Sequence, residues 1–250
     1  ISPHIHCFRE RALIQNQPCS EQEWEEAFHF VHHYSQGTAL TYFEYTTLAA
    51  LRLFSLQSLD FILLEVGLGG RLDASNVVDP DLSIITSIGF DHCQWLGNTL
   101  SAIASEKAGI LRYKKPVIIG ETQHNQPILK KASALDSPSH VYQHDFTLES
   151  EIFCSNLGQK WRIPKNTIHP QALACAVFAC QLLRPELKKC TVQHAIQELH
   201  IPGRWEFHAE PMATYFDCAH NPQAFSFLKK KILQQKSRYH KIFVLLAMKE

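Results

Sequence analysis

The sequence predicts an α/β fold in which a doubly wound, mostly parallel sheet is followed by the start of a second α/β domain. Three observations support this prediction. Apolar segments of strand length alternate with helix-like segments, the connections between them are short, and polar residues gather directly after the apolar segments. Such alternation is typical of parallel strands joined by crossover helices. We place a domain boundary near Gly203, so that residues 1–203 form the central domain and residues 204–250 begin the next one.

The chain begins with two predicted helices and a strand. Residues 21–33 follow Ser20, and Glu23 three positions later completes a capping box. Residues 42–55 carry leucines and a phenylalanine at helical spacing. Apart from Glu65, residues 61–66 are apolar, so that both faces of a strand would be apolar. This predicts a strand in the centre of a parallel sheet.

The next segments complete a βαβαβ pattern. It consists of a strand at 82–88, a helix at 100–112 and a short strand at 116–119. Residues 141–164 interrupt this pattern with short pieces that alternate polar and apolar residues, so we predict a small antiparallel layer there.

Two helices and a new structural unit follow. The helices are predicted at 170–183, which is strongly apolar, and at 192–199. Beyond the predicted boundary, a strand at 213–216, a helix at 222–235 and a strand at 241–247 repeat the α/β order.

The composition excludes several classes of protein. Of the 250 residues, 45 % are hydrophobic, which is enough for one large or two modest cores. The 24 basic side chains equal the 24 acidic ones, so neither a nucleic-acid surface nor a strongly acidic partner is indicated. No run approaches the ~18 apolar residues of a membrane span. The eight cysteines include no CxxC pair, which favours reduced thiols and a cytoplasmic protein.

The segment LDFILLEVGLGGRLDASN, residues 59–76, carries the first candidate site. Glu65 ends the predicted buried strand, and three glycines follow at positions 67, 69 and 70. A charged group in such a run is costly unless it is paired or binds a cation. At the carboxyl end of a parallel strand a carboxylate can hold Mg²⁺. A tight strand-to-helix turn with a solvated Glu65 fits the same spacing.

Other strand ends carry further candidates. Asp91 and His92 follow the strand at 82–88, and Asp217 precedes the His220-Asn221 pair beyond the boundary. A neutral histidine is a common metal ligand, although His92 is equally compatible with a loop or capping role. Lys107 lies in a weakly polar stretch where burial would make its amine easier to neutralise. An exposed, paired helix lysine is the alternative that the local sequence favours.

Six segments in collinear order resemble the bifunctional dihydrofolate synthase/folylpolyglutamate synthases of the Mur ligase superfamily. They are LTYFEYTTLAAL (40–51), LEVGLGGRLDASN (64–76), TSIGFDHCQWLG (86–97), EKAGILR (106–112), PGRWE (202–206) and FDCAHNP (216–222). The resemblance covers nearly the whole chain. It implies a P-loop NTPase-like Mur ligase central domain followed by the start of a Rossmann-like domain.

The resemblance implies an ATP-dependent ligase of folate biosynthesis and folate polyglutamylation. Such an enzyme activates a carboxylate of dihydropteroate or tetrahydrofolate as an acyl phosphate, which the amine of L-glutamate then attacks. The implied cofactors are ATP and Mg²⁺, with K⁺ as an optional further cation. The protein is expected to be a cytoplasmic monomer that binds neither nucleic acid nor membrane.

The resemblance also assigns roles to individual residues. It implies that Mg²⁺ is held by Ser2, Glu65 and His92, and that Lys107 is carbamylated, which turns its amine into a carboxylate. The expected ATP-binding residues are Gln171, Arg204 and Asp217. The remaining assignments are His220 and Asn221 at the reaction centre and a pterin-binding set of Thr41, Tyr42, Phe43, Glu44, Leu72, Asp73 and Ala74.

The sequence departs from the family pattern in three places. The family's glycine-rich phosphate loop is expected before Ser2, outside this sequence, so we expect the fragment alone to be inactive. Gln171 stands where the family has an asparagine that contacts adenine. The second domain is cut short after two predicted strands and one helix.

Two other functions remain open. The chain could come from a noncatalytic folate or nucleotide binder, or from a Mur-type ligase that adds amino acids to cell-wall precursors. The segments at 41–44 and 70–74 disfavour the cell-wall ligase because they match folate-type members. A metal-dependent hydrolase is disfavoured because Glu65, His92 and Lys107 form no compact zinc-binding motif.

Overall fold

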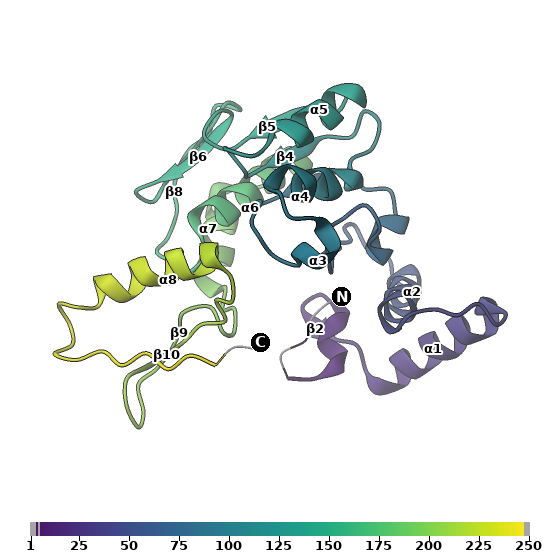
Figure 1. Ribbon diagram of the computed structural model, residues 1–250, viewed down its shortest axis with the longest axis horizontal. Helices are drawn as coiled ribbons and strands as arrows, with labels where there is room; N and C mark the ends of the chain where they lie inside the picture. The colour runs from purple at the N-terminus through teal and green to yellow at the C-terminus, as the bar shows by residue number, and fades with distance from the viewer. Residues whose placement is uncertain (1–3, 5, 248–250) are drawn as a thin grey trace. The chain divides into compact units, whose positions relative to one another are not determined.

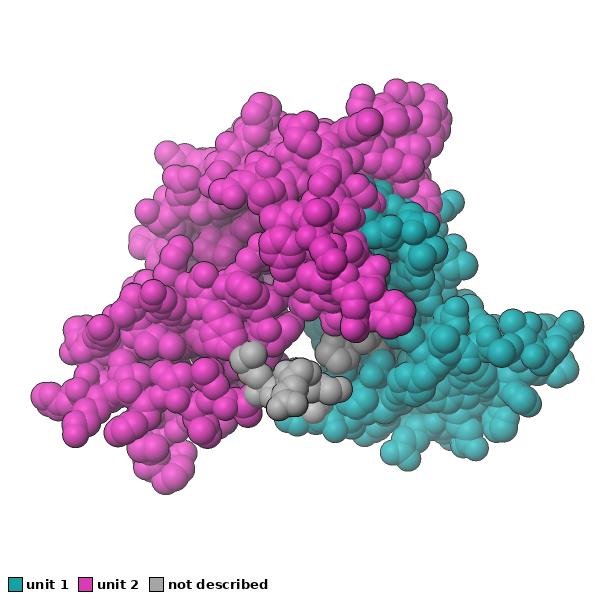
Figure 2. Space-filling model, in the orientation of Figure 1, with its two compact units in different colours: residues 1–80, 106–110 teal, residues 81–105, 111–250 magenta. Residues whose placement is uncertain are grey.

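The computed structural model describes residue 4 and residues 6–247 (Figure 1). The chain divides into two compact units, which Figure 2 distinguishes by colour. The first comprises residues 1–80 and 106–110, and the second comprises residues 81–105 and 111–250. Residues 204–250 therefore cluster with the preceding residues of the second unit, and the domain boundary near Gly203 stays a prediction. Ser2, a predicted metal ligand, lies outside the described residues.

The first unit is built around two helices, α1 (Glu21–Ser35) and α2 (Tyr42–Ser55), in agreement with the predicted ranges. Each begins with a capping box, so the box predicted at Ser20 is confirmed. The helices pack through an apolar core that includes Trp24 of α1 and Phe54 of α2. The short elements of this unit are η1 (Phe8–Arg11), β1 (Leu13–Ile14), β2 (Gln17–Pro18) and η2 (Ala74–Val77).

The strand predicted at 61–66 is wrong. These residues have no regular secondary structure, and the side chain of Leu63 is 89 % exposed. A strand needs a neighbour to complete its hydrogen-bond ladder, and no described segment pairs with this one. Glu65 is therefore exposed instead of ending a buried strand.

The second unit contains the parallel sheet. Its strands, β3 (Ser83–Ile85), β4 (Val117–Ile119) and β5 (Ser139–Val141), pair in the order β3-β4-β5. The central strand β4 is fully buried. This confirms the α/β class and the strands predicted within 82–88 and 116–119. The sheet also contains β5, which was not predicted because its residues, Ser139, His140 and Val141, do not form an apolar run.

Helices and an antiparallel layer complete the central part of this unit. The helices α3 (Cys93–Leu96), α4 (Leu100–Lys107) and α5 (Gln126–Ala134) occur along the chain between β3 and β5. The last two residues of α4 and the short η3 (Ala108–Ile110) that follows it belong to the first unit. The layer consists of β6 (Phe146–Glu149), β7 (Ile152–Ser155) and β8 (Lys160–Arg162), which pair antiparallel as predicted for this segment.

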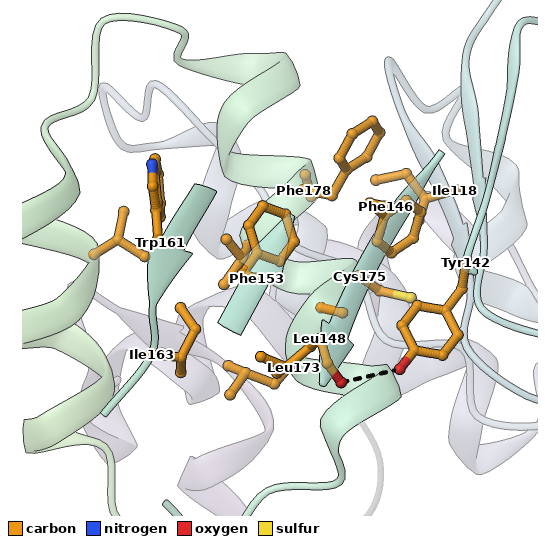
Figure 3. Close-up of a cluster of buried hydrophobic side chains, with 14 of the residues drawn as sticks. Ile118, Tyr142, Phe146, Leu148, Phe153, Trp161, Ile163, Leu173, Cys175 and Phe178 are labelled. Atoms are coloured by element: carbon orange, nitrogen blue, oxygen red, sulfur yellow. Dashed lines mark hydrogen bonds between the residues drawn. The ribbon is translucent and has the colours of Figure 1, made fainter. Parts of the chain in front are cut away.

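An extensive core lies between this antiparallel layer and α6 (Pro170–Leu183) (Figure 3). Phe146 stacks on Phe178 with ring centroids 4.5 Å apart. The Tyr142 hydroxyl donates to the Leu148 carbonyl at 3.4 Å, the contact drawn as a dashed line in Figure 3. Burial raises the pKa of the Cys175 thiol to about 12, so this thiol stays protonated in the core.

The C-terminal part of the second unit follows α7 (Lys189–Glu198). It consists of the antiparallel pair β9 (Glu206–His208) and β10 (Thr214–Phe216) and the helix α8 (Pro222–Gln234), so the strand and helix predicted at 213–216 and 222–235 are confirmed. The strand predicted at 241–247 is wrong, because these residues form no ladder with any described segment, and Leu245 is 97 % exposed. In the described chain no helix has the length and hydropathy needed to cross a membrane.

Candidate functional site

In the first unit, the glycine-rich loop at 67–76 is bound to the end of α4. The Arg71 amide donates to the Glu106 carbonyl at 2.9 Å, and the two side chains form an ion pair at 3.0 Å. The Asn76 amide group donates to the Arg71 carbonyl at 3.0 Å and to the Gly109 carbonyl at 3.3 Å. The loop and segment 106–110 are thus held together by both backbone and side chains.

The glycines allow this close packing. A Cβ at Gly70 would lie 2.9 Å from the Glu106 carbonyl oxygen and 3.0 Å from that of Lys107. A Cβ at Gly109 would lie 2.6 Å from the Arg71 Cα. The close approach that the sequence suggested for a ligand is therefore made here by the chain's own backbone. Lys107, half-buried at the last position of α4, lies at this junction.

The predicted pterin-binding segment at 41–44 begins α2. The Glu44 carboxylate accepts from both the amide and the hydroxyl of Thr41 at 2.7 Å. These hydrogen bonds, that of the hydroxyl first, lower the pKa of Glu44 below its usual value. Thr41 and Glu44 therefore form the cap of the helix, whereas Tyr42 is 63 % exposed and lies against the Arg11 guanidinium at 5.4 Å.

The structure brings the two predicted pterin-binding segments together at Gly67. A Cβ at Gly67 would lie 2.7 Å from the Phe43 ring and 3.2 Å from the Asp73 carboxylate. Asp73 is fixed by accepting from the amides of Leu68 and Ser75, each at 2.9 Å. Next to it, the side chain of Leu72 is 79 % exposed and Ala74 begins η2. Phe43 and Leu72 therefore offer apolar surface beside a rigidly held carboxylate.

The predicted metal ligands fit a divalent cation in their chemistry. They include the exposed carboxylate of Glu65 in the first unit and the imidazole of His92 in the second. Carboxylate oxygen and neutral imidazole both bind divalent cations. Within residues 4 and 6–247, however, no group of three or more His, Cys, Asp or Glu residues is placed to hold a metal ion. The metal site thus remains a prediction.

In the second unit, Gln171 connects the ends of two parallel strands. Its amide nitrogen donates to the Thr86 carbonyl at 2.8 Å and to the Gly120 carbonyl at 2.6 Å. These carbonyls directly follow β3 and β4. Both amide hydrogens are thus committed to the backbone, and the amide oxygen is the part of Gln171 that can still meet a ligand.

Glu121 is a buried carboxylate to which the sequence analysis gave no role. It is 8 % exposed and accepts from the amides of Ile88 at 3.0 Å and Gln123 at 2.7 Å. Burial alone would raise the pKa of Glu121, but the hydrogen bonds from these amides and that of His124 outweigh burial and hold the pKa below its usual value. Its position directly after a buried strand, at Gly120-Glu121, was the signal that could have found it.

Asp91, a strand-end candidate to which no role was assigned, contacts three predicted site residues. Its carboxylate lies 3.6 Å from His92 Nε2, 3.5 Å from His220 Nε2 and 3.4 Å from Asn221 Nδ2. Asn221 also begins α8, where its side-chain oxygen accepts from the Ala224 amide at 3.0 Å. The structure thus brings His92, His220 and Asn221 around one carboxylate.

The remaining predicted ATP-binding residues lie in two adjoining turns. Asp217 accepts from the amides of Trp205 and Ala219, each at 3.0 Å, and so ties the turn at 203–205 to the end of β10. Trp205 has a φ of 54°, which is rare for so bulky a residue. The neighbouring Arg204 side chain is exposed.

Curated relatives match this chain over most of its length. The dihydrofolate synthase/folylpolyglutamate synthase of Escherichia coli (strain K12) is 36 % identical over 231 residues, which cover 91 % of this chain and 55 % of the relative. The protein of the same name from Haemophilus influenzae is 35 % identical over 92 % of this chain and 57 % of the relative. The chain therefore spans somewhat more than half the length of these relatives. No family model matches it.

Solved structures agree with the sequence matches. E. coli FolC in complex with DHPP and ADP superposes with a TM-score of 0.89 at 33 % identity, covering 94 % of this chain and 57 % of that one. The bifunctional enzyme from Yersinia pestis CO92, complexed with AMPPNP and a Mn ion, also gives a TM-score of 0.89 at 33 % identity, covering 95 % and 58 %. The fold described above is thus that of these enzymes.

Proposed function

We propose that this chain, which belongs to the dihydrofolate synthase/folylpolyglutamate synthase family of the Mur ligase superfamily, is part of an ATP-dependent ligase that adds L-glutamate to dihydropteroate or a folate. The similarity to a FolC structure that holds DHPP and ADP carries this proposal. The structural match extends over 94 % of this chain. Because the chain spans little more than half of the relatives, the activity is proposed for the whole protein.

The proposed reaction has two steps. A carboxylate oxygen of the pterin substrate attacks the γ-phosphorus of ATP, which forms an acyl phosphate and releases ADP. The amine of glutamate then attacks the acyl carbon, a C–N bond forms, and phosphate and a proton leave. Arg204 would stabilise phosphate charge, and Asp217 would accept from the ribose hydroxyls. The hydrogen bonds that fix Asp217 and the exposure of Arg204 support these roles.

The proposed metal site consists of Ser2, Glu65 and His92. When bound, Mg²⁺ would supply positive charge where phosphoryl transfer builds up negative charge. Carbamylation of Lys107 would add a carboxylate to the site, and K⁺ is an optional further cation. A neighbouring structure that holds Mn and AMPPNP supports the divalent metal and the nucleotide. The place of Lys107 at the end of α4, where the glycine-rich loop packs against it, supports its part in the site.

The proposed pterin site is formed by residues 41–44 and 72–74. Phe43 and Leu72 would supply apolar contacts to the flat ring, and Asp73 would accept hydrogen bonds from its nitrogens. The meeting of both segments at Gly67 supports a common site. Thr41 and Glu44 would act mainly by holding the first turn of α2.

The adenine contact is proposed for the Gln171 oxygen, since its amide hydrogens bond the strand ends. An oxygen acceptor suits the exocyclic amine of adenine. His220 and Asn221 are proposed to face the reaction centre. We further propose that the protein is a monomer and, in line with its free cysteines, cytoplasmic.

The test is ATP turnover by the whole protein with dihydropteroate, tetrahydrofolate and a muramyl substrate, each with its amino acid. Amide product with either pterin substrate is the expected result. Binding of nucleotide or folate without turnover would support the noncatalytic binder instead. Product with only the muramyl substrate would support a cell-wall ligase.

A further inference from the structure

The first turn of α8 is held against the segment that follows β3. The Gln223 amide nitrogen donates to the Ile88 carbonyl at 2.5 Å. The amide of the same residue, Ile88, donates to the buried Glu121 carboxylate at 3.0 Å. Ile88 is therefore fixed on both sides of its backbone, and Gln223 bonds to a rigid partner.

Gly89 makes room for this contact. A Cβ at position 89 would lie 2.7 Å from the Gln223 side-chain carbon that carries the amide, which is closer than real Cβ atoms approach. The backbone of Gly89 does not have a positive φ, and the three atoms nearest to an added Cβ all belong to Gln223, so removing that side chain should remove the clash. Glycine at position 89 thus leaves free the space that the Gln223 amide occupies.

Asp91 makes a second connection between the same two segments. Its Oδ2 lies 3.4 Å from Asn221 Nδ2 and 3.5 Å from His220 Nε2. The other polar atoms of these two side chains are also engaged, since Asn221 Oδ1 accepts from the Ala224 amide and His220 Nδ1 lies 2.9 Å from the Cys218 carbonyl. Each side chain is thereby held at both ends, so its orientation is defined.

We propose that Gln223 and Asp91 are positioning residues that fix His220 and Asn221 beside the segment that follows β3. The proposal rests on the proposed function, in which His220 and Asn221 face the reaction centre. A displacement of about 1 Å at a reacting group can cost roughly a hundredfold in rate. Loss of either contact should therefore lower kcat and leave the KM for the pterin substrate unchanged, because the proposed pterin segments lie in the other unit.

A double-mutant cycle on positions 89 and 223 gives a sharp test in the whole protein. Gly89→Ala should push the Gln223 amide out of place and lower kcat at least about tenfold, and Gln223→Ala should do the same. The double variant should be no worse than either single variant, because the clash disappears with the Gln223 side chain. Gln234→Ala, at the other end of α8, is the matched control and should leave kcat unchanged.

Amide hydrogen exchange in the ligand-free protein provides a readout that needs no activity. The Ala224 amide, which Asn221 caps, should exchange faster in the Gly89→Ala, Gln223→Glu and Asp91→Asn variants than in the Gln234→Ala control. Gln223→Glu and Asp91→Asn keep side-chain size, so they test the contacts even if smaller residues prevent folding.

The two proposals fail in different ways. A wild-type protein that forms no amide product overturns the proposed function, whereas the exchange experiment still decides on the contacts. Unchanged exchange at Ala224 overturns the positioning role. If the effects of Gly89→Ala and Gln223→Ala on kcat multiply in the double variant, the positioning role is also overturned. Two residues that act through one contact cannot have independent effects.

Discussion

Arg71 and Glu106 connect the glycine-rich loop to the end of α4 through a backbone hydrogen bond of 2.9 Å and a side-chain ion pair of 3.0 Å. The exposed ion pair itself adds little stability. Its importance lies in the backbone contact beside it, which places the loop directly against Lys107. The proposed modified lysine and the proposed pterin loop therefore share one junction.

Gly70→Ala should destabilise the first unit. The new Cβ would lie 2.9 Å from the Glu106 carbonyl oxygen, so the loop must move away from α4, at a cost of about 1–3 kcal/mol. Chemical denaturation measures this change. Gly158→Ala is the comparison, because that glycine has open space but a φ of 79° and should lose only about 1 kcal/mol, from backbone strain. Equal or smaller losses at Gly70 would contradict the packing argument.

Lys107→Ala should abolish ligation in the whole protein, because the site would lose the proposed carbamate. Added short carboxylates such as acetate should restore part of the rate by supplying the missing negative group. The assay is amide formation with and without acetate. Lys114→Ala, which changes an exposed lysine in the following turn, is the control. It should form amide at the wild-type rate without acetate. Full activity of Lys107→Ala would rule out the carbamate role.

Phe43→Ala should raise the KM for the pterin substrate about tenfold or more while the KM for ATP stays within twofold. The lost ring is worth roughly 1.5–3 kcal/mol of apolar contact when a ligand covers it. Steady-state kinetics with each substrate varied in turn separates the two constants. Leu48→Ala, a partly exposed position on the same helix, should change neither. Similar increases in both KM values would indicate that Phe43 supports the fold and not the substrate.

Gln171→Ala should lower stability and weaken nucleotide binding together. The amide bonds two backbone carbonyls at 2.8 Å and 2.6 Å, so its loss should cost about 1–3 kcal/mol. Thermal unfolding in the absence of ATP measures the stability, and titration with ADP measures the affinity. Gln171→Asn is the informative second variant, because its side chain is one methylene too short to make both bonds. If Gln171→Asn matches the wild type in both measurements, the bridging role is incorrect.

Glu121→Gln should remove part of the acid sensitivity of the fold. The pKa of Glu121 in the folded protein lies below the ordinary value of 4.5. Its charged form therefore stabilises the fold above pH 4.5, and this contribution is lost as the pH falls through the folded pKa. The variant should be less stable than the wild type near pH 7, and the difference should shrink below pH 4.5. A difference that stays constant with pH would contradict this.

The helices α1 and α2 were predictable because their signals are local, whereas α3 and α5 were not predicted. Ser20 with Glu23 and Thr41 with Glu44 form capping boxes within four residues of sequence, and α1 and α2 start where those boxes indicate. The segments at 61–66 and 241–247 failed as strands for the opposite reason. Their apolar residues would suit a strand buried in a sheet. A strand also needs a partner strand from elsewhere in the chain for its backbone hydrogen bonds, and neither segment has one among the described residues.

The candidate site was predictable only in part. The candidate residues came from the family resemblance. The structure shows that some residues of the predicted pterin-binding set, such as Thr41, cap a helix, whereas others, such as Leu72, are exposed. Glu121 and Gln223 were missed, and Asp91 was a candidate without an assigned role, because what these residues do depends on contacts between distant segments. The Gln223 amide, for example, bonds a carbonyl 135 positions earlier.

Residues 106–110 cluster with residues 1–80, although residues 81–105 belong to the other unit. A growing chain on the ribosome therefore cannot complete this unit when it has been made only as far as residue 80. The partners of Gly70 and Arg71 emerge only after the first strand of the parallel sheet has been made. The two units consequently cannot be separated by a single cut in the gene, and neither can finish folding strictly before synthesis of the other has begun.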